Sequence, residues 1–246
     1  ESPGRGATFE APVCIGRGIF VLMGNNIKLK NLTFAGAKNP WFTGAGVLVL
    51  GDNPTFERLS LIGNQNGILA GGSATSKIVA RNSLFQGNGS CLGACAHGLY
   101  VGERVASLVV ENCRFFDTRT AHHIKSRARD NVIADNRIDD GDNGTSSYLI
   151  DIPWGGRTEI RGNWMRKGQN SSNKEVAISI GEEGVKNETP DIVVQDNVFI
   201  NGLTEQTSFV RNSTGAQAIL ERNKLSGRIV PLLNTGLSNE TASPNR

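Results

Sequence analysis

Five residues of types that can do acid–base chemistry lie in the middle of the chain, at Tyr100, His123, Lys125, Arg127 and Asp151. They could perform β-elimination on a uronic-acid polymer, which needs a neutralised carboxylate, a base for the C5 proton and an acid for the leaving oxygen. Arg127 could bind the carboxylate through two parallel hydrogen bonds. Lys125 or His123 could be the base, its pKa lowered by cationic neighbours. Tyr100 could be the acid, and Asp151 could orient the base or help to hold a Ca²⁺ ion.

Further polar and aromatic residues border this catalytic set and are candidates for substrate binding. They are His97, His122, Arg129, Tyr148, Trp154, Glu182 and Glu183. Trp154 closely follows Asp151 and could be a platform on which a sugar ring stacks, and Arg129 is an alternative to Arg127 as partner of the carboxylate. The segment 122–129 contains five side chains that can be cationic, which repel one another unless an anion joins them. That crowding favours a functional role for the segment.

The same residues also have a structural explanation that needs no substrate. Lys125 and Asp151 could form an ion pair on a solvated sheet, worth under about 1 kcal/mol. Tyr100 is a common residue of β-strands and could simply pack there. A non-catalytic protein that binds glycan, or a structural protein, would carry these residues as a polar face.

Two other reactions compete with elimination. Glycoside hydrolysis needs two carboxylates roughly 5–9.5 Å apart, and Asp151 with Glu182 or Glu183 is the obvious pair near the set. Epimerisation at C5 begins with the same proton abstraction as elimination, so the sequence does not separate the two. The cationic surroundings of Lys125 favour elimination or epimerisation, because a uronate substrate is itself an anion.

The catalytic candidates can meet only if strands from different parts of the chain are stacked. Six short segments align for this purpose: 66–70, 97–101, 122–126, 148–152, 176–180 and 207–211. Side chains alternate along a strand, so the third residue of each segment points inward and the fourth outward. The inward residues are Ile68, Leu99, Ile124, Ile150, Ile178 and Phe209, and the outward residues are Leu69, Tyr100, Lys125, Asp151, Ser179 and Val210. By the same alternation, His123 and Arg127 would flank Lys125 on the outer face.

An irregular repeat marks the turns between the strands. Short apolar runs end in an asparagine or a near-equivalent, at Asn31, Asn64, Asn82, Cys113, Asn136, Asn163, Asn197 and Asn223. Asparagines at the same turn of successive coils can form a ladder of hydrogen bonds, and no coil can bury its apolar face alone. The sequence therefore predicts an all-β, single-domain right-handed parallel β-helix with loop insertions over residues 1–246. Segments 1–18 and 235–246 are expected to be peripheral or capping.

The asparagine repeat and the strand Gly98-Leu99-Tyr100-Val101 resemble those of the pectate-lyase-like superfamily of right-handed parallel β-helices. The resemblance covers nearly the whole chain, from about residue 19 to residue 233. It implies a long outer groove that suits an extended polysaccharide, and it raises the expectation of a lyase or an epimerase. No narrower family is indicated.

The composition limits the partners of the protein. Its net charge of +3 is nearly balanced, with 26 basic and 23 acidic residues, so charge does not indicate nucleic acid as a partner. No apolar run reaches the roughly 18 residues needed to span a bilayer. We expect a monomer without a membrane span, whose partner is an anionic polysaccharide.

The cysteines and acidic residues bear on location and metals. Cys91 and Cys95 could form a disulfide, which would suit a secreted or periplasmic protein, and two free thiols are the alternative. The spacing of cysteine and histidine disfavours zinc, and no metal ligand is assigned. The acidic run from Asp135 to Asp142 resembles a Ca²⁺ loop but lacks a terminal Glu in register, so an ordinary acidic turn is expected.

Overall fold

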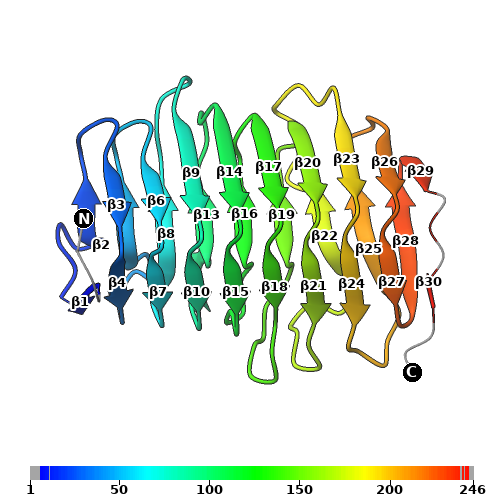
Figure 1. The fold of residues 1–246 in the computed structure, drawn as a ribbon, viewed down its shortest axis with the longest axis horizontal. Helices are drawn as coiled ribbons and strands as arrows, with labels where there is room; N and C mark the ends of the chain where they lie inside the picture. Colours follow the sequence, from blue (N-terminus) through cyan, green and yellow to red (C-terminus); the bar gives the residue numbers. More distant parts are fainter. Residues whose placement is uncertain (1–5, 11, 239, 241, 244–246) are drawn as a thin grey trace.

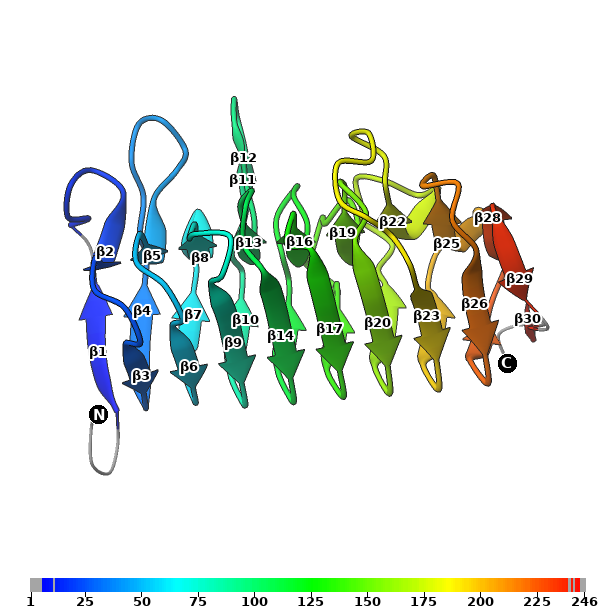
Figure 2. The same ribbon diagram turned by 90° about the horizontal axis from the view of Figure 1, so that it is seen from above.

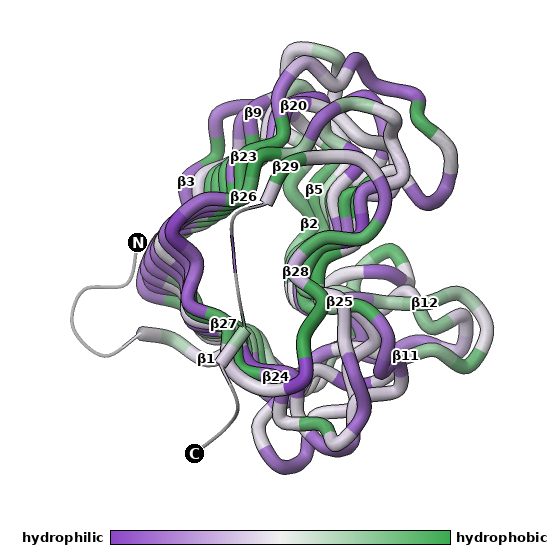
Figure 3. The backbone as a smooth tube through the Cα atoms, turned by 90° about the vertical axis from the view of Figure 1, so that its right-hand side faces the viewer, coloured by the Kyte–Doolittle hydropathy of each residue, from purple (hydrophilic) through white to green (hydrophobic). Residues whose placement is uncertain are grey.

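A computed structural model describes residues 6–10, 12–238, 240 and 242–243, and every regular element among them is a β-strand. Most strands belong to three parallel sheets, which the chain visits in turn as it advances along the long axis (Figure 1). Viewed down that axis, the sheets surround one narrow interior (Figure 3). The predicted all-β parallel β-helix is therefore confirmed. None of the described residues forms a helix long and apolar enough to cross a membrane.

The strands of each sheet follow one another along the axis. Sheet A contains β1 (Ala7–Glu10), β4 (Leu32–Ala35), β7 (Ser60–Ile62), β10 (Leu84–Gln86), β15 (Arg114–Phe116), β18 (Arg137–Asp139), β21 (Trp164–Lys167), β24 (Val198–Asn201), β27 (Lys224–Ser226) and β30 (Ala242–Ser243). Sheet B contains β2 (Gly18–Leu22), β5 (Ala45–Val49), β8 (Asn66–Ala70), β13 (Leu99–Val101), β16 (Ile124–Ser126), β19 (Ile150–Ile152), β22 (Val176–Ile180), β25 (Thr207–Asn212) and β28 (Ile229–Asn234). Sheet C contains β3 (Lys28–Lys30), β6 (Thr55–Glu57), β9 (Lys77–Arg81), β14 (Ser107–Glu111), β17 (Asp130–Ala134), β20 (Arg157–Arg161), β23 (Ile192–Gln195), β26 (Ala218–Glu221) and β29 (Gly236–Ser238). A separate antiparallel hairpin is formed by β11 (Ser90–Cys91) and β12 (Cys95–Ala96).

The end strands lie in the segments expected to be peripheral. β1 pairs with β4 at one end of sheet A. At the other end of the molecule, β29 pairs with β26 and β30 pairs with β27. The described parts of segments 1–18 and 235–246 thus contribute strands that continue the sheets.

The core is a stack of apolar side chains in register from coil to coil. On sheet B the buried residues in register are Ile68, Leu99, Ile124, Ile150 and Ile178, as predicted. At the next strand the predicted register is wrong by one residue, because Ile178 pairs with Val210 and not with Phe209. Phe209 is buried as well and stacks on Phe199 at 5.1 Å between ring centroids. Each such side chain contributes about 1.5–3 kcal/mol when buried, so neighbouring coils stabilise one another.

An asparagine ladder runs along the turn from sheet C to sheet A. Its buried members are Asn136, Asn163, Asn197 and Asn223. The Oδ1 atom of each accepts the backbone N–H of the ladder residue in the preceding coil, at distances of 2.8–3.1 Å. Cys113 continues the ladder, since its Sγ accepts the backbone N–H of Ser83 at 3.4 Å. The predicted ladder is thus confirmed from Cys113 to Asn223.

The prediction that Asn31, Asn64 and Asn82 belong to this same ladder is wrong. Asn64 belongs to a shorter ladder with Asn88, where the chain passes from sheet A to sheet B. Asn82 has a left-handed backbone with φ of 51° and is exposed, and Ser83 takes the ladder position next to it. Asn31 has the same backbone conformation, with φ of 57°. The short interval between Asn64 and Asn82 arose because these residues lie at different corners of the coil.

Replacing Asn163 by alanine should lower the free energy of unfolding by about 3 kcal/mol, because two buried backbone groups lose their partners at about 1–3 kcal/mol each. These groups are the carbonyl of Ile133, 2.8 Å from Nδ2, and the N–H of Asn136, 3.0 Å from Oδ1. Urea unfolding would measure the change. The exposed Asn170→Ala is the control and should stay within about 0.5 kcal/mol of the parent protein. Similar small losses for both variants would contradict a stabilising role of the ladder.

Candidate functional site

The outer face of sheet B carries the predicted column of polar side chains. Tyr100 of β13 pairs with Lys125 of β16, and Lys125 pairs with Asp151 of β19. Asp151 pairs in turn with Ser179 of β22. The alignment of these central strands is therefore confirmed, and it places three of the predicted catalytic residues on adjacent coils.

Lys125 is buried between two carboxylates. Its Nζ lies 3.0 Å from Oδ2 of Asp151 and 2.6 Å from Oε1 of Glu183. Burial disfavours the ammonium charge, but the two carboxylates outweigh burial and raise the pKa of Lys125. The predicted lowering of this pKa is wrong, because the closest charged neighbours of Lys125 are anions. In this arrangement Lys125 is a cation that binds carboxylates.

The two carboxylates on Lys125 differ in their affinity for protons. Asp151 is only 2% exposed, and burial raises its pKa to about 6 against the opposing effect of Lys125. The Glu183 side chain is 40% exposed, and hydrogen bonds from Lys125 and Arg127 outweigh its partial burial and lower its pKa. At pH 5, therefore, Asp151 is mostly neutral while Glu183 remains charged.

Arg127 joins Glu183 to two aromatic residues. Its Nη2 and Nε lie 2.5 and 3.2 Å from Oε2 of Glu183, and its Nη1 donates a hydrogen bond to the hydroxyl oxygen of Tyr100. The guanidinium also lies 5.4 Å from the ring centroid of Tyr100 and 5.3 Å from that of Trp154. Arg127 lies on the same face as Lys125, as predicted, and the two cations converge on one carboxylate.

A stack of rings lies beside the polar column. The centroids of His97 and His122 are 4.8 Å apart, and those of His122 and Tyr148 are 4.9 Å apart. Nδ1 of His97 accepts the backbone N–H of His122, and Nδ1 of His122 accepts that of Tyr148. Because a backbone N–H can only donate, both imidazoles carry their proton on Nε2. Burial, reinforced by cationic neighbours, holds the pKa of both histidines well below 6.5, so both are neutral hydrogen-bond donors.

His123 lies inside the coil, so its predicted role as a base beside Lys125 is wrong. It is fully buried, with Nδ1 2.8 Å from Oγ1 of Thr118 and Nε2 2.9 Å from Oδ1 of Asp140. Strand β16 begins only at Ile124, so His123 occupies the corner before it, where the alternation of side chains does not hold. The hydrogen bond from His123 helps to lower the pKa of Asp140 to about 2 despite its burial.

Arg129 also lies away from the polar column. It is exposed at the turn from sheet B to sheet C, and its Nη2 donates to the carbonyl oxygen of Ala74. It lines a different groove, together with Arg157 and Lys186. The prediction that Arg129 binds substrate beside Lys125 is therefore wrong, since the turn directs the side chain toward another surface.

The loop 181–191, between β22 and β23, carries Glu182 and Glu183 back over the site. Its path is fixed by Trp154, whose carbonyl oxygen accepts the backbone N–H of Lys186 at 3.1 Å. The ammonium of Lys186 lies 4.0 Å from the centroid of the Trp154 ring. Two cations, Arg127 and Lys186, thus contact this ring, so Trp154 supports the loop that brings the glutamates to the site.

Arg211 is a member of the outer column that the sequence alignment missed. It pairs with Ser179, whereas the predicted Val210 is buried. Nη2 of Arg211 lies 2.5 Å from Oε2 of Glu182 and 2.9 Å from the hydroxyl oxygen of Tyr148. The hydroxyls of Tyr148 and Ser179 donate to the same glutamate oxygen at 2.8 and 2.7 Å. A register one residue later in the segment 207–211 would have identified Arg211.

A groove of about 420 Å³ lies over sheet B beside the column. Its lining includes Arg17, His97, Tyr100, His122, Lys125 and Arg127. Loops project on both sides of this face (Figure 3), and hairpin β11–β12 rises beside it (Figure 2). Cys91 and Cys95 form the predicted disulfide across the hairpin. Cations, neutral imidazole donors and a hydroxyl together suit a ligand that is anionic and rich in oxygen.

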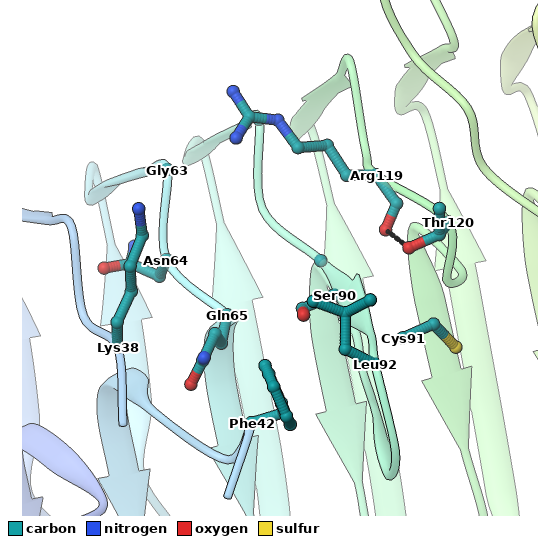
Figure 4. Close-up of a pocket in the computed structure, with 12 residues that line it drawn as sticks. Lys38, Phe42, Gly63, Asn64, Gln65, Ser90, Cys91, Leu92, Arg119 and Thr120 are labelled. Carbon is teal, nitrogen blue, oxygen red and sulfur yellow. Dashed lines mark hydrogen bonds between the residues drawn. The ribbon is translucent and has the colours of Figure 1, made fainter. Parts of the chain in front are cut away.

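A second cavity of about 400 Å³ lies on the other side of the hairpin (Figure 4). It is lined by Lys38, Phe42, Leu92 and Arg119, among others, and by none of the predicted site residues. Cys91 faces this cavity and its disulfide partner lines the groove, so the hairpin separates the two spaces.

The acidic run is engaged with the protein itself. Asp139 binds Arg166 at 2.7 Å and Arg137 at 3.0 Å, and Asp140 binds His123. Within the described residues, no three histidine, cysteine, aspartate or glutamate side chains are grouped so that they could hold a metal ion.

Comparison with protein families supports the fold. A family model described as a right-handed beta helix region matches residues 17–171, which agrees with the parallel sheets and with the predicted handedness. No curated protein and no solved structure matches the chain.

Proposed function

Since the chain belongs to the right-handed β-helix family, we propose that it is a carbohydrate-active enzyme that cleaves an acidic polysaccharide by β-elimination. The proposal is carried by the convergence of Lys125 and Arg127 on the carboxylate of Glu183 at the groove. A uronate carboxylate has the charge and planar shape of this glutamate, so the substrate would take its place on the two cations. The disulfide of the hairpin supports a secreted or periplasmic location as part of the proposal.

Each chemical step has a candidate residue at the groove. Lys125 and Arg127 neutralise the uronate, which makes its C5 proton easier to remove, and the Nε2–H group of His97 donates to a substrate oxygen. Nε2 of His122 lies 3.5 Å from Oδ2 of Asp151. Glu183, displaced from the cations, is deprotonated at neutral pH and takes the C5 proton. Tyr100 accepts a hydrogen bond from Arg127, so its own hydrogen is free to point elsewhere and can protonate the leaving oxygen. The C5–H and C4–O bonds break as the C4–C5 double bond forms.

Hydrolysis is the second candidate, and one observation favours it. Asp151 has its pKa raised to about 6 while the pKa of Glu183 is lowered, and both bind Lys125. A neutral carboxylic acid close to a carboxylate is the arrangement that glycoside hydrolases use. The deep burial of Asp151 beneath Lys125 makes elimination the preferred reaction.

Incubation with alginate, pectate, glucuronan and glycosaminoglycans would test the reaction. Elimination produces an unsaturated uronate that absorbs ultraviolet light, and each cut also creates a reducing end. Reducing ends without absorbance would indicate hydrolysis, and a change in uronate configuration without either signal would indicate epimerisation. Absence of all three signals on every polymer would refute an enzymatic role on these glycans.

Replacing Glu183 by glutamine should lower kcat by about 10²–10⁴-fold, the usual contribution of a general base. The amide of the glutamine cannot accept the C5 proton. Because the competing carboxylate of Glu183 is gone, Lys125 and Arg127 can still bind the substrate. Initial rates of product absorbance would give kcat, and binding would be measured separately by calorimetry. Glu188→Gln, an exposed change in the same loop, should leave both unchanged. Full activity of Glu183→Gln would remove Glu183 as the base.

A further inference from the structure

Two arginine–tyrosine pairs lie along the outer face of sheet B, each bound by one glutamate of loop 181–191. Arg127 and Tyr100 are joined, and Glu183 binds Arg127. Further along the axis, Arg211 and Tyr148 are joined, and both bind Glu182. Adjacent residues of one loop thus occupy two separate cationic sites.

The two arginines are more deeply buried than the glutamates that bind them. The side chains of Arg127 and Arg211 are 17% and 18% exposed, whereas those of Glu183 and Glu182 are 40% and 39% exposed. Arg211 projects from strand β25, while both glutamates lie on a loop between strands. The glutamates therefore cover the arginines from the solvent side, where a ligand would approach.

Arg211 has unused capacity to bind an anion. Its Nη2 contacts Glu182, but its buried Nε has no hydrogen-bond partner among the described residues. Arg127, in contrast, uses both Nε and Nη2 on a single oxygen of Glu183. A carboxylate could bind Arg211 through both Nε and Nη2, as Glu183 binds Arg127. Nε of Arg211 would then have a hydrogen-bond partner.

We infer that Arg211, with Tyr148 and Ser179, forms a second subsite for a uronate of the same polysaccharide chain. Glu182 and Glu183 occupy the two subsites until the substrate displaces them. Lys125 and Arg211 lie three strands apart in sheet B, which is about 14 Å at the usual spacing between strands. A monosaccharide therefore fills only one subsite, and the ligand that fills both is an oligomer with repeated carboxylates. The inference rests on the proposed function, because the second subsite would bind another uronate of the chain that is held at Lys125 and Arg127.

Calorimetric titration with galacturonate and mannuronate oligomers, from disaccharide to hexasaccharide, would test the second subsite. The parent protein should bind the hexasaccharide at least about tenfold more tightly than the disaccharide, as an added charged hydrogen bond implies. Arg211→Gln should remove this difference and leave disaccharide binding unchanged. Glu182→Gln should strengthen hexasaccharide binding several-fold and leave disaccharide binding unchanged, because a competing carboxylate is gone.

Several outcomes would overturn the inference. If Arg211→Gln kept the dependence on length, or weakened both oligomers equally, Arg211 would only hold the loop in place. Arg211→Lys, with thermal unfolding as a check on the fold, keeps the charge and should retain part of the length dependence. A length dependence without unsaturated product would leave the subsite standing and refute elimination. Unsaturated product together with an intact length dependence in Arg211→Gln would support elimination and refute the second subsite. If neither oligomer series bound, both the subsite and the proposed reaction would be refuted.

Discussion

Replacing Tyr100 by phenylalanine should lower kcat by about 10²–10⁴-fold with little change in KM, because the proposed acid loses its proton while the ring remains. The Tyr100 ring packs edge-on against His97, with centroids 5.0 Å apart. Phenylalanine keeps this contact, so the loss of the hydroxyl should not disturb the groove. The guanidinium of Arg127 is unchanged and can still bind the uronate once Glu183 is displaced. Steady-state rates of ultraviolet absorbance on the polymer that gives product would measure both constants.

Tyr148→Phe is the matched control for this loss. It also removes a tyrosine hydroxyl, but one that belongs to the proposed second subsite and not to the Lys125 site. There the hydroxyl oxygen of Tyr148 is hydrogen-bonded to Glu182 and Arg211. We expect it to change KM more than kcat, since the second subsite only binds substrate. An equal loss of kcat in both variants would show that the hydroxyl of Tyr100 has no special role in proton transfer.

Replacing Lys125 by methionine should lower the free energy of unfolding by about 3–5 kcal/mol near pH 8, the cost of removing one partner of a buried ion pair. The change leaves the carboxylate of Asp151 buried without the ammonium 3.0 Å from its Oδ2. Glu183 is more exposed and can turn toward water, so it adds little to the loss. Turnover should also be abolished, because half of the carboxylate-binding site is gone.

The loss of stability in Lys125→Met should be smaller at pH 5 than at pH 8. Folding raises the pKa of Asp151 from 3.8 to about 6, so the folded state binds this proton more tightly than the unfolded state. The ammonium of Lys125 opposes this rise, so its removal should raise the pKa of Asp151 further. As the pH falls toward about 6, Asp151 therefore becomes neutral in the variant before it does so in the parent protein, and a neutral Asp151 no longer needs a cation. Urea unfolding at pH 5 and pH 8 would measure the difference, with the exposed Lys77→Met as control. A loss independent of pH would mean that Asp151 is not the group left unpaired.

The repeat made the central part of the site predictable from sequence. Tyr100, Lys125 and Asp151 follow apolar residues that must face the core, so the alternation of side chains places them on the outer face. Stacking of the coils then brings them into register without any knowledge of the loops. The same argument recovered the asparagine ladder from Cys113 onward, where each coil repeats the same turn.

The failures lie where strands end and where loops intervene. His123 precedes its strand by one residue, and its side chain turns into the corner. Arg211 was displaced by a one-residue error in register after the long loop 181–191, which offers no periodic signal. The contacts of Glu183 with Lys125 and Arg127 join residues 56 to 58 positions apart. Such contacts depend on the path of the loop over Trp154, which sequence periodicity does not encode.

The hairpin β11–β12 stands beside the groove as a fixed wall, because the Cys91–Cys95 disulfide ties its two strands together. If a glycan binds in the groove as proposed, a branch or ester group on its edge toward the hairpin would meet this wall. Cutting would then be confined to stretches that are bare on that edge, and heavily decorated polymers would remain as long fragments. The wall would thereby select the architecture of the polysaccharide, while the cations would select its charge.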